Sequence, residues 1–384
     1  MPTELGIDEL LKEVRGLRIG AILNPTSVTG ELRHLADLLD EAGALAALFG
    51  PEHGVRGDVQ YLEEVADARD PRTGVPEHSL YGRDFASLTP RPEHLRGLDA
   101  LVFDVQDVGS RYYTYLATMS LSLQAAVRAK LKFIVLDRPN PIGGARVEGG
   151  IVHPGFESFV GLHPVAARHG LTAGEFARFI NEQIKCELRV VELRGWRRQM
   201  LFGETGLPWV LPSPNMPSIE TALVYPGMCL LEGTNLSEGR GTTRPFEIFG
   251  APWLDGEKLA AALAAEKIQG ARFRPCSFTP TWDKHFKERC HGVQTHLEKP
   301  KALEAVKLGV AAIVHSRAQD PARFRWRTEK YEFVEHIPAI DLLTGSNAFR
   351  KRVESGASVK DLLALWDIER AEYEKRRERF LLYA

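Results

Sequence analysis

The sequence predicts an α/β protein, with a Rossmann-like parallel sheet domain followed by a smaller α+β C-terminal domain. Over the first half, short continuous apolar runs alternate with segments of helical period, as in a parallel sheet covered by helices on both faces. The chain has 384 residues, too many for one ordinary core, so two domains are expected. After about residue 211 the alternation of strands and helices gives way to proline-rich and glycine-rich segments. We place the domains at 1–245 and 246–384, with the active-site cleft between them.

The elements follow from the spacing of apolar residues. The strands expected in the first domain are 17–23, 44–49, 99–105, 132–137 and 188–193. The helices expected there are about 31–42, 114–129 and 172–183, the last beginning with a capping box of Thr172 and Glu175. Between Gly50 and about Arg96 lies a long irregular stretch, which is usually functional inside a compact domain. In the second domain we expect helices near 256–266, 301–316 and 358–378 and strands near 272–278 and 290–297.

Composition excludes several classes of partner. The net charge of −2 gives no electrostatic basis for binding nucleic acid or an anionic membrane. No apolar run approaches the roughly 20 residues that cross a bilayer. The N-terminus lacks the basic and apolar regions of a signal peptide. As written, the chain is expected in the cytoplasm, or outside it if an export signal has been trimmed.

Common cofactor and catalytic motifs are missing from the sequence. It contains no G-x-G-x-x-G or G-x-x-x-x-G-K-[ST] stretch, which argues against dinucleotide and P-loop binding despite the Rossmann-like pattern. It also lacks the G-x-S-x-G elbow of α/β-hydrolases and the H-E-x-x-H of zincins. We therefore expect no cofactor and no resident metal.

Polar side chains gather where the expected strands end. In open α/β sheets, ligands bind beyond the carboxyl ends of the strands. The residues at those ends are Asn24; Glu52, His53 and Arg56; Asp104, Gln106, Asp107 and Arg111; and Asp137, Arg138 and Asn140. Four strands thus deliver polar groups to one rim, which predicts a site there.

The stretch from Phe49 to Asp58 is the most pronounced of these strand ends. Three glycines and a proline surround Glu52, His53 and Arg56, and this density of glycine indicates unusual dihedral angles or a close approach by a ligand. A tight turn whose polar residues only satisfy the backbone is the alternative.

The third strand end concentrates further candidates. A turn at Asp107 would bring it close to Asp104, and either could pair with Glu52 in acid/base chemistry or, with His53, bind a hard cation. Alternatively, Asp107 caps the following helix with Arg111 as its ion-pair partner. The tyrosines beside this loop suit stacking on a sugar ring, although at least one of them is expected in the core. They are Tyr112, Tyr113 and Tyr115.

Two further segments are candidates for substrate contacts. Prolines on both sides of Asn140 fix its direction, as needed in a positioning residue or in a structural turn. Arg240 and Arg244 lie in a loop rich in glycine and threonine, which could hold a carboxylate or be a solvated surface loop.

Several of these segments together resemble one family, the exo-lytic β-N-acetylmuramidases. The resemblance covers essentially the whole chain, and its motifs occur in order. They are Phe49–Gly57, Phe103–Tyr115, Val135–Gly144, Val147–Gly149, Pro212–Pro217 and Glu232–Thr242.

The resemblance implies hydrolysis of terminal, non-reducing N-acetylmuramic acid from peptidoglycan fragments, and hence a small sugar as substrate. Glu52 lies in the family's Pro-Glu-His-Gly motif, which makes it the best catalytic candidate. Our hypothesis makes it the general acid, tuned by His53, with Asp107 or Asp104 as base or charge stabiliser. The substrate-binding residues expected with them are Asn24, Arg56, Arg111, Tyr112, Tyr113, Arg138, Asn140, Asn215, Glu232 and Arg240. The three asparagines would position hydroxyl and acetamido groups, and one of Arg56, Arg111 and Arg240 would pair with the lactyl carboxylate.

One position departs from the family pattern. Many relatives carry a glutamate where this chain has Gln124, so activity on the family substrate is in question. Two alternatives stay open: a metal-dependent hydrolase or esterase using His53, Asp104 and Asp107, and a non-catalytic muropeptide-binding protein derived from the enzymes. The oligomeric state is not predicted.

Overall fold

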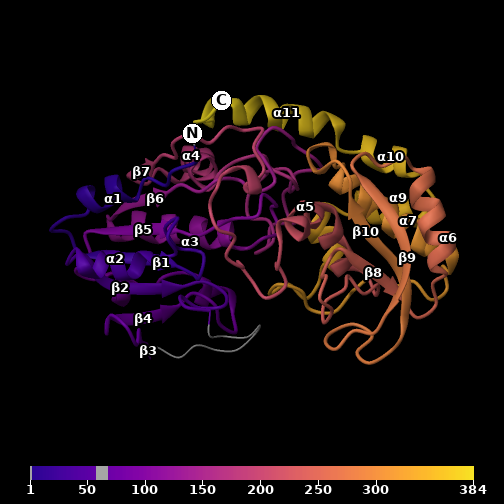
Figure 1. The fold of residues 1–384 in the computed structure, drawn as a ribbon, viewed down its shortest axis with the longest axis horizontal. Helices are drawn as coiled ribbons and strands as arrows, with labels where there is room; N and C mark the ends of the chain where they lie inside the picture. Colours follow the sequence, from indigo (N-terminus) through magenta and orange to yellow (C-terminus); the bar gives the residue numbers. More distant parts are fainter. Residues whose placement is uncertain (1, 58–67) are drawn as a thin grey trace.

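The computed structural model describes residues 2–57 and 68–384, which form two units side by side (Figure 1). The first contains a seven-stranded sheet in the order β3-β4-β2-β1-β5-β6-β7. Neighbouring strands are parallel, except that β3 runs antiparallel to β4. The strands are β1 (Ile19–Leu23), β2 (Leu45–Gly50), β3 (Ala68–Arg69), β4 (Pro76–Ser79), β5 (Ala100–Asp104), β6 (Lys132–Leu136) and β7 (Leu188–Val191). The Rossmann-like α/β prediction is confirmed.

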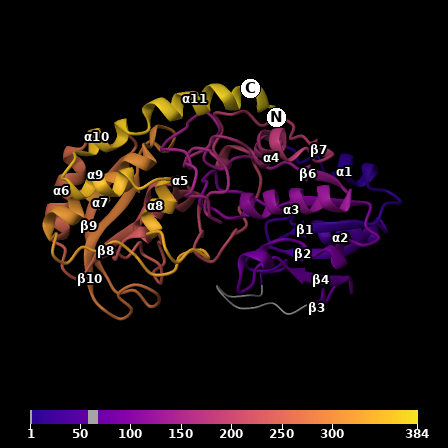
Figure 2. The same ribbon diagram turned by 180° about the vertical axis from the view of Figure 1, so that it is seen from behind.

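Helices cover both faces of this sheet because its central strands are apolar on both sides. On one face, α1 (Ile7–Glu13) and α2 (Leu35–Glu41) pack on Ile19, Ala21 and Leu23. On the other face, α3 (Tyr115–Ala129) and α4 (Ala173–Ile184) join Phe103 and Phe133 in the main core. Figure 2 shows α3 lying across the sheet on this second face.

The second unit is built on a three-stranded antiparallel sheet, in the order β8-β10-β9. Its strands are β8 (Ile248–Ala251), β9 (Ala271–Phe278) and β10 (Cys290–Leu297). Its helices are α5 (Ile219–Met228), α6 (Gly256–Ala265), α7 (Ala305–Gln319), α8 (Ala339–Thr344), α9 (Ala348–Glu354), α10 (Val359–Ala364) and α11 (Asp367–Arg377). No helix of the described ranges has the length and apolar character of a membrane span.

Most expected elements are present, with a few differences. The capping box is confirmed: Thr172 Oγ1 accepts from Glu175 N at 3.2 Å, and Glu175 Oε2 accepts from Thr172 N at 3.0 Å. The single helix expected at 358–378 is two, α10 and α11, separated at Leu365 and Trp366. The stretch expected to be irregular holds β3 and β4, and its residues 58–67, with Asp58, lie outside the described ones.

The two units are held together by the C-terminal segment. Helix α11 leaves the second unit and runs back over the first, so both termini lie on the first unit (Figure 1). Its Arg377 donates to the carbonyl oxygens of Gly144 and Gly170, and Tyr373 donates to that of His169. A domain boundary near 245 falls between the two sheets and stays a prediction.

Helices α5 and α7 approach so closely that glycine is required at their contact. A Cβ atom on Gly309 of α7 would lie 2.0 Å from the carbonyl oxygen of Gly227 on α5. One on Gly227 would lie 1.7 Å from the carbonyl oxygen of Ala305. Because backbone, not a flexible side chain, fills the space, neither position can take a larger residue without the helices separating.

We therefore expect Gly309→Ala to lower the free energy of unfolding by about 2–3 kcal/mol through overpacking. Urea denaturation measures this change. Gly30→Ala is the matched control, because no heavy atom lies within 4 Å of its added Cβ. Equal stability of the two variants would show that the α5–α7 contact is not rigid.

Candidate active site

A polar pocket lies between the carboxyl end of the first sheet and the second unit. It is lined by Glu52, His53, Tyr112, Tyr113, Thr114, Tyr115, Val160, Ser213, Asn215, Tyr225, Glu232, Arg240, Tyr331 and Glu332. The first seven belong to the sheet unit, and the last two to the segment that connects α7 to α8. Seven of the fourteen predicted site residues thus meet here: Glu52, His53, Tyr112, Tyr113, Asn215, Glu232 and Arg240.

Glu52 lies on the turn that directly follows β2. The turn is closed by a hydrogen bond from Gly54 N to the carbonyl oxygen of Pro51 at 3.0 Å. His53 and Gly54 have positive φ angles of 75° and 73°, which confirms the unusual dihedrals expected of this stretch. A non-glycine residue in this conformation costs free energy, and such strain is found repeatedly at functional sites. The strained turn leaves the Glu52 side chain 17% exposed, with its Oε1 4.0 Å from His53 Nε2.

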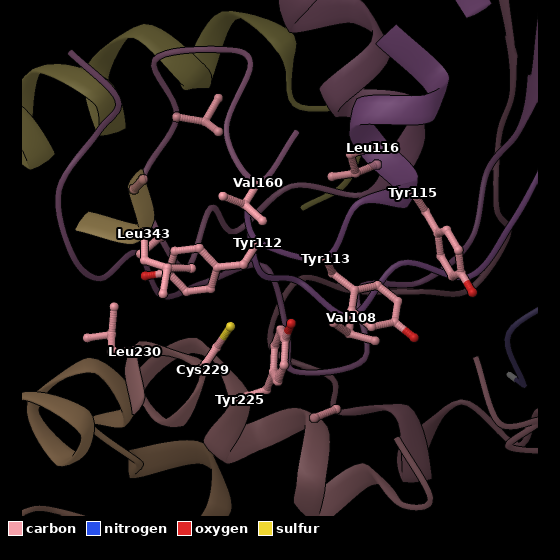
Figure 3. Packing of buried hydrophobic residues seen from close by; sticks show 14 of the residues in the cluster. Val108, Tyr112, Tyr113, Tyr115, Leu116, Val160, Tyr225, Cys229, Leu230 and Leu343 are labelled. Carbon is pink, nitrogen blue, oxygen red and sulfur yellow. The ribbon is translucent and has the colours of Figure 1, made fainter. Parts of the chain in front are cut away.

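Aromatic rings form one wall of the pocket, and they divide into two directions (Figure 3). Tyr113 packs edge-on against Tyr115 and Tyr225, with ring centroids 4.9 and 5.8 Å apart. The Tyr115 hydroxyl donates to the carbonyl oxygen of Pro212 at 2.5 Å and so ties the 212–215 segment to α3. Tyr112 points the other way, toward Leu343, and is 3% exposed. Tyr113 and Tyr115 are buried as well, so the expectation that at least one of these tyrosines is in the core is met.

Arg240 is at the centre of a buried ionic network. Its Nη2 donates to Glu232 Oε1 at 2.7 Å, and its Nε lies 3.3 Å from Glu238 Oε1. Lys284 Nζ completes the pairing of Glu238 at 2.9 Å. The Tyr331 hydroxyl donates to Glu232 Oε2 at 2.8 Å. Each oxygen of Glu232 thus has a partner, and the pKa of its carboxyl group is lowered although burial opposes this.

Glu52 and Glu332 have the opposite electrostatic environment. Burial, and next the negative charge of Glu332, raise the pKa of Glu52 from 4.5 to about 8. Burial, and next the charge of Glu232, raise the pKa of Glu332 to about 7. Glu52 therefore holds a proton at neutral pH, which is the state that a general acid requires.

The structure does not bring Asp104 and Arg138 to the pocket. Arg138 binds Asp104 through both Nε and Nη2, and Asp104 is fully buried. The second contact, from Nη2 to Oδ2, is 2.9 Å long. Asp104 ends β5 and Arg138 follows β6, and Arg138 lines a separate small hollow with Thr26, Val28 and Gln106.

Asp107 and two of the predicted asparagines also have internal partners. Asp107 Oδ2 accepts from Gly109 N at 2.6 Å and lies 3.2 Å from His169 Nε2. Asn24 Oδ1 accepts from Thr26, and Asn140 is bonded to the backbone by both ends of its amide. The hydrogen bonds of Asn140 match the alternative of a structural turn. His53, Asp104 and Asp107 are not brought together, because each contacts a different partner.

Two of the three arginines expected to bind a carboxylate of the substrate are held elsewhere. Arg56 donates to Asp37 at 2.8 Å and to both oxygens of Asp70. Arg111 donates to the carbonyl oxygens of Gly150, Val165 and Leu343 and so connects the two units. The ion pair considered between Arg111 and Asp107 is not what holds its guanidinium group. Of the three, only Arg240 lines the pocket.

Sequence reasoning missed the contribution of the segment around Tyr331 and Glu332. No helical or strand period marks this segment, and the glutamate lies between two aromatic residues. That flanking is the one local signal, and it is weak. Tyr225 was missed because α5 was not predicted.

Family models match nearly the whole chain. The N-terminal model of the exo-β-N-acetylmuramidase NamZ matches residues 19–220, and the C-terminal model matches residues 223–383. The chain belongs to the NamZ family. It is 44% identical to the peptidoglycan β-N-acetylmuramidase NamZ of Bacillus subtilis (strain 168), over 99% of this chain and 91% of that protein. The predicted resemblance is confirmed.

Solved structures of two DUF1343 family proteins from Bacteroides fragilis NCTC 9343 have the same fold as this NamZ family member. One, BF0371, is 36% identical with a TM-score of 0.89. The other, BF0379, is 29% identical with a TM-score of 0.79. In both cases the match covers 100% of this chain and 99% of the other.

Gln124, the departure from the family pattern, is not among the pocket residues. It lies on α3 nine positions beyond Tyr115, or about 13 Å along the helix axis. A side chain at this distance does not replace a group in the pocket. The glutamine at position 124 therefore does not remove a carboxylate from this pocket.

The raised pKa of Glu52 predicts how stability depends on pH. The folded protein keeps the Glu52 proton to about pH 8, whereas the unfolded chain loses it near 4.5. Stability from this group is therefore full below pH 4.5 and is lost as the pH rises toward 8. We expect wild type to lose unfolding free energy relative to Glu52→Gln over this range, as urea denaturation at several pH values would show. A constant difference between the two proteins would contradict the raised pKa.

Proposed function

We propose that this protein is an exo-acting glycoside hydrolase that releases terminal, non-reducing N-acetylmuramic acid from peptidoglycan fragments. The observation that carries the proposal is the position of the Glu52 carboxyl group in a pocket lined by tyrosine rings, Asn215 and Arg240. Burial there raises the pKa of this group, which favours the protonated form. Family membership supports the same chemistry, because the B. subtilis relative is a peptidoglycan β-N-acetylmuramidase. Such a product would serve the recycling of cell wall.

Glu52 is the general acid in this proposal. Its proton passes to the glycosidic oxygen as the bond from that oxygen to C1 breaks, so the departing sugar leaves as a neutral alcohol. His53, 4.0 Å away, tunes the carboxyl group. The strained backbone of the turn fixes the direction of both side chains.

Residues around Glu52 supply recognition. Tyr113 offers an apolar face and a polar tip to a sugar, and Asn215 offers an amide for hydroxyl or acetamido groups. Arg240 is the cation we assign to the lactyl carboxylate, because it lines the pocket and Arg56 and Arg111 do not. We do not retain Asp104, Arg138 or Asn140 as substrate contacts, because they lie outside the lining of the pocket.

The acid role predicts a dependence on the leaving group. Glu52→Gln removes the proton but keeps the shape, so release of N-acetylmuramic acid from its disaccharide with N-acetylglucosamine should fall by about 100- to 10,000-fold. The loss should be smaller on para-nitrophenyl N-acetylmuramide, whose leaving group needs no proton. Mass spectrometry of the products and absorbance measure the two rates.

The exposed Glu31→Gln is the matched control and should retain wild-type rates on both substrates. Near wild-type turnover of the disaccharide by Glu52→Gln would show that Glu52 is not the acid. Failure of wild type to release any N-acetylmuramic acid would refute the proposed function itself.

A further inference from the structure

A short turn from the second unit brings Glu332 into the pocket. Backbone hydrogen bonds in both directions join Tyr331 and Val334 at 2.9 Å, so Glu332 and Phe333 form the tip. Both tip residues have positive φ angles, 44° and 71°. For residues with a Cβ this conformation costs about 1 kcal/mol or more each, and it persists only where the surroundings hold it.

Tyr331 holds the turn on one side of Glu332. Its ring is buried beneath the guanidinium group of Arg327, 5.0 Å from the ring centroid. Its hydroxyl donates to Glu232, which is in turn fixed by Arg240. This side of the turn is therefore part of the ionic network of the pocket.

Phe333 holds the turn on the other side, and it does so against the first unit. Its ring contacts those of Tyr81, Phe85 and Phe159 edge-on, with centroids 6.1, 6.4 and 6.0 Å apart. These three rings all come from the sheet unit, so Phe333 joins the units next to the pocket. Glu332 is thus held by Tyr331, which binds the second unit, and by Phe333, which packs on the sheet unit.

The other acids near the pocket are already committed. Glu232 is bound by Arg240 and Tyr331, and Glu238 by Arg240 and Lys284. Asp104 and Asp107 lie outside the lining. Of the two other glutamates in the pocket lining, Glu232 is thus occupied, and Glu332 is the one left to act with Glu52.

We propose that Glu332 is the second catalytic carboxyl group, acting as the base opposite the acid Glu52. This inference rests on the proposed function. Glu332 takes a proton from a water molecule, whose oxygen forms the new bond to C1 of the sugar. Glu52 gives its proton to the glycosidic oxygen, and the bond from that oxygen to C1 breaks. Each turnover moves one proton from Glu52 to Glu332, and exchange with solvent restores both groups.

The surrounding charges assign the two roles in this order. Glu52 is influenced by Glu332, Arg240 and Glu232, lies near His53, and in turn influences Tyr113 and Tyr115. Glu332 is influenced by Glu232, Arg240 and Arg327, and in turn influences Tyr331. The negative charge of Glu332 raises the pKa of Glu52, so an ionised Glu332 favours the protonated form of Glu52.

The test compares Glu332→Gln with Glu52→Gln on two substrates, the disaccharide and para-nitrophenyl N-acetylmuramide. A base acts on the water rather than on the leaving group, so Glu332→Gln should lose roughly 100-fold or more on both substrates alike. Glu52→Gln should lose most on the disaccharide. The pH profile of kcat/KM should also lose its acidic limb in Glu332→Gln. The exposed Glu335→Gln, on the same segment, is the matched control and should behave as wild type.

The outcomes separate this inference from the proposed function. If Glu52→Gln is inactive on the disaccharide but Glu332→Gln stays within about threefold of wild type on both substrates, Glu332 is not the base and the function stands. Binding of N-acetylmuramic acid, measured by calorimetry, excludes a merely structural effect. A catalytic role leaves this binding intact in Glu332→Gln and lets Glu332→Asp recover part of the rate. Loss of binding together with activity, with no recovery in Glu332→Asp, would overturn the proposal.

Discussion

The pocket depends on a shortage of positive charge. Among its described lining residues, Arg240 carries the only guanidinium or ammonium group, whereas Glu52, Glu232 and Glu332 all face the same space. Arg240 forms ion pairs with Glu232 and with Glu238. Burying further carboxylates without cations costs more than keeping them protonated. The fold therefore favours a proton on Glu52 by pairing Arg240 with Glu232 and Glu238 instead.

The architecture explains why this pocket lies between the units and not at the usual crevice of a Rossmann-like sheet. At the carboxyl ends of β5 and β6, Asp104 and Arg138 bind each other and lie outside the lining of the pocket. The turn after β2 and the tyrosines after β5 are then the polar groups that remain open at this edge. The second unit closes over them with Glu232, Arg240 and the turn at Glu332. Helix α11 and Arg111 hold this arrangement from the other side.

Local sequence patterns predicted most of the first sheet and the unusual backbone of the turn that carries Glu52, because both are decided by neighbouring residues. Apolar runs determine strands, and clustered glycines indicate a strained turn wherever they occur. Arg111 was a different case, because its partners Gly150 and Leu343 are 39 and 232 positions away. The role of Glu332 depends on contacts of the same kind. No local pattern shows that Phe333 packs on Tyr81 or that Asp104 meets Arg138.

The most direct test of the raised pKa values of Glu52 and Glu332 is a pH titration of the glutamate carboxyl groups by carbon NMR, in protein labelled at those carbons. Two signals should titrate near pH 7 and pH 8 in wild type. One of them should vanish in each of Glu52→Gln and Glu332→Gln. The Glu52 signal should move to lower pH in Glu332→Gln, because the charge that raises its pKa is gone. Titration of every glutamate below about pH 5.5, as in exposed carboxyl groups, would contradict the account.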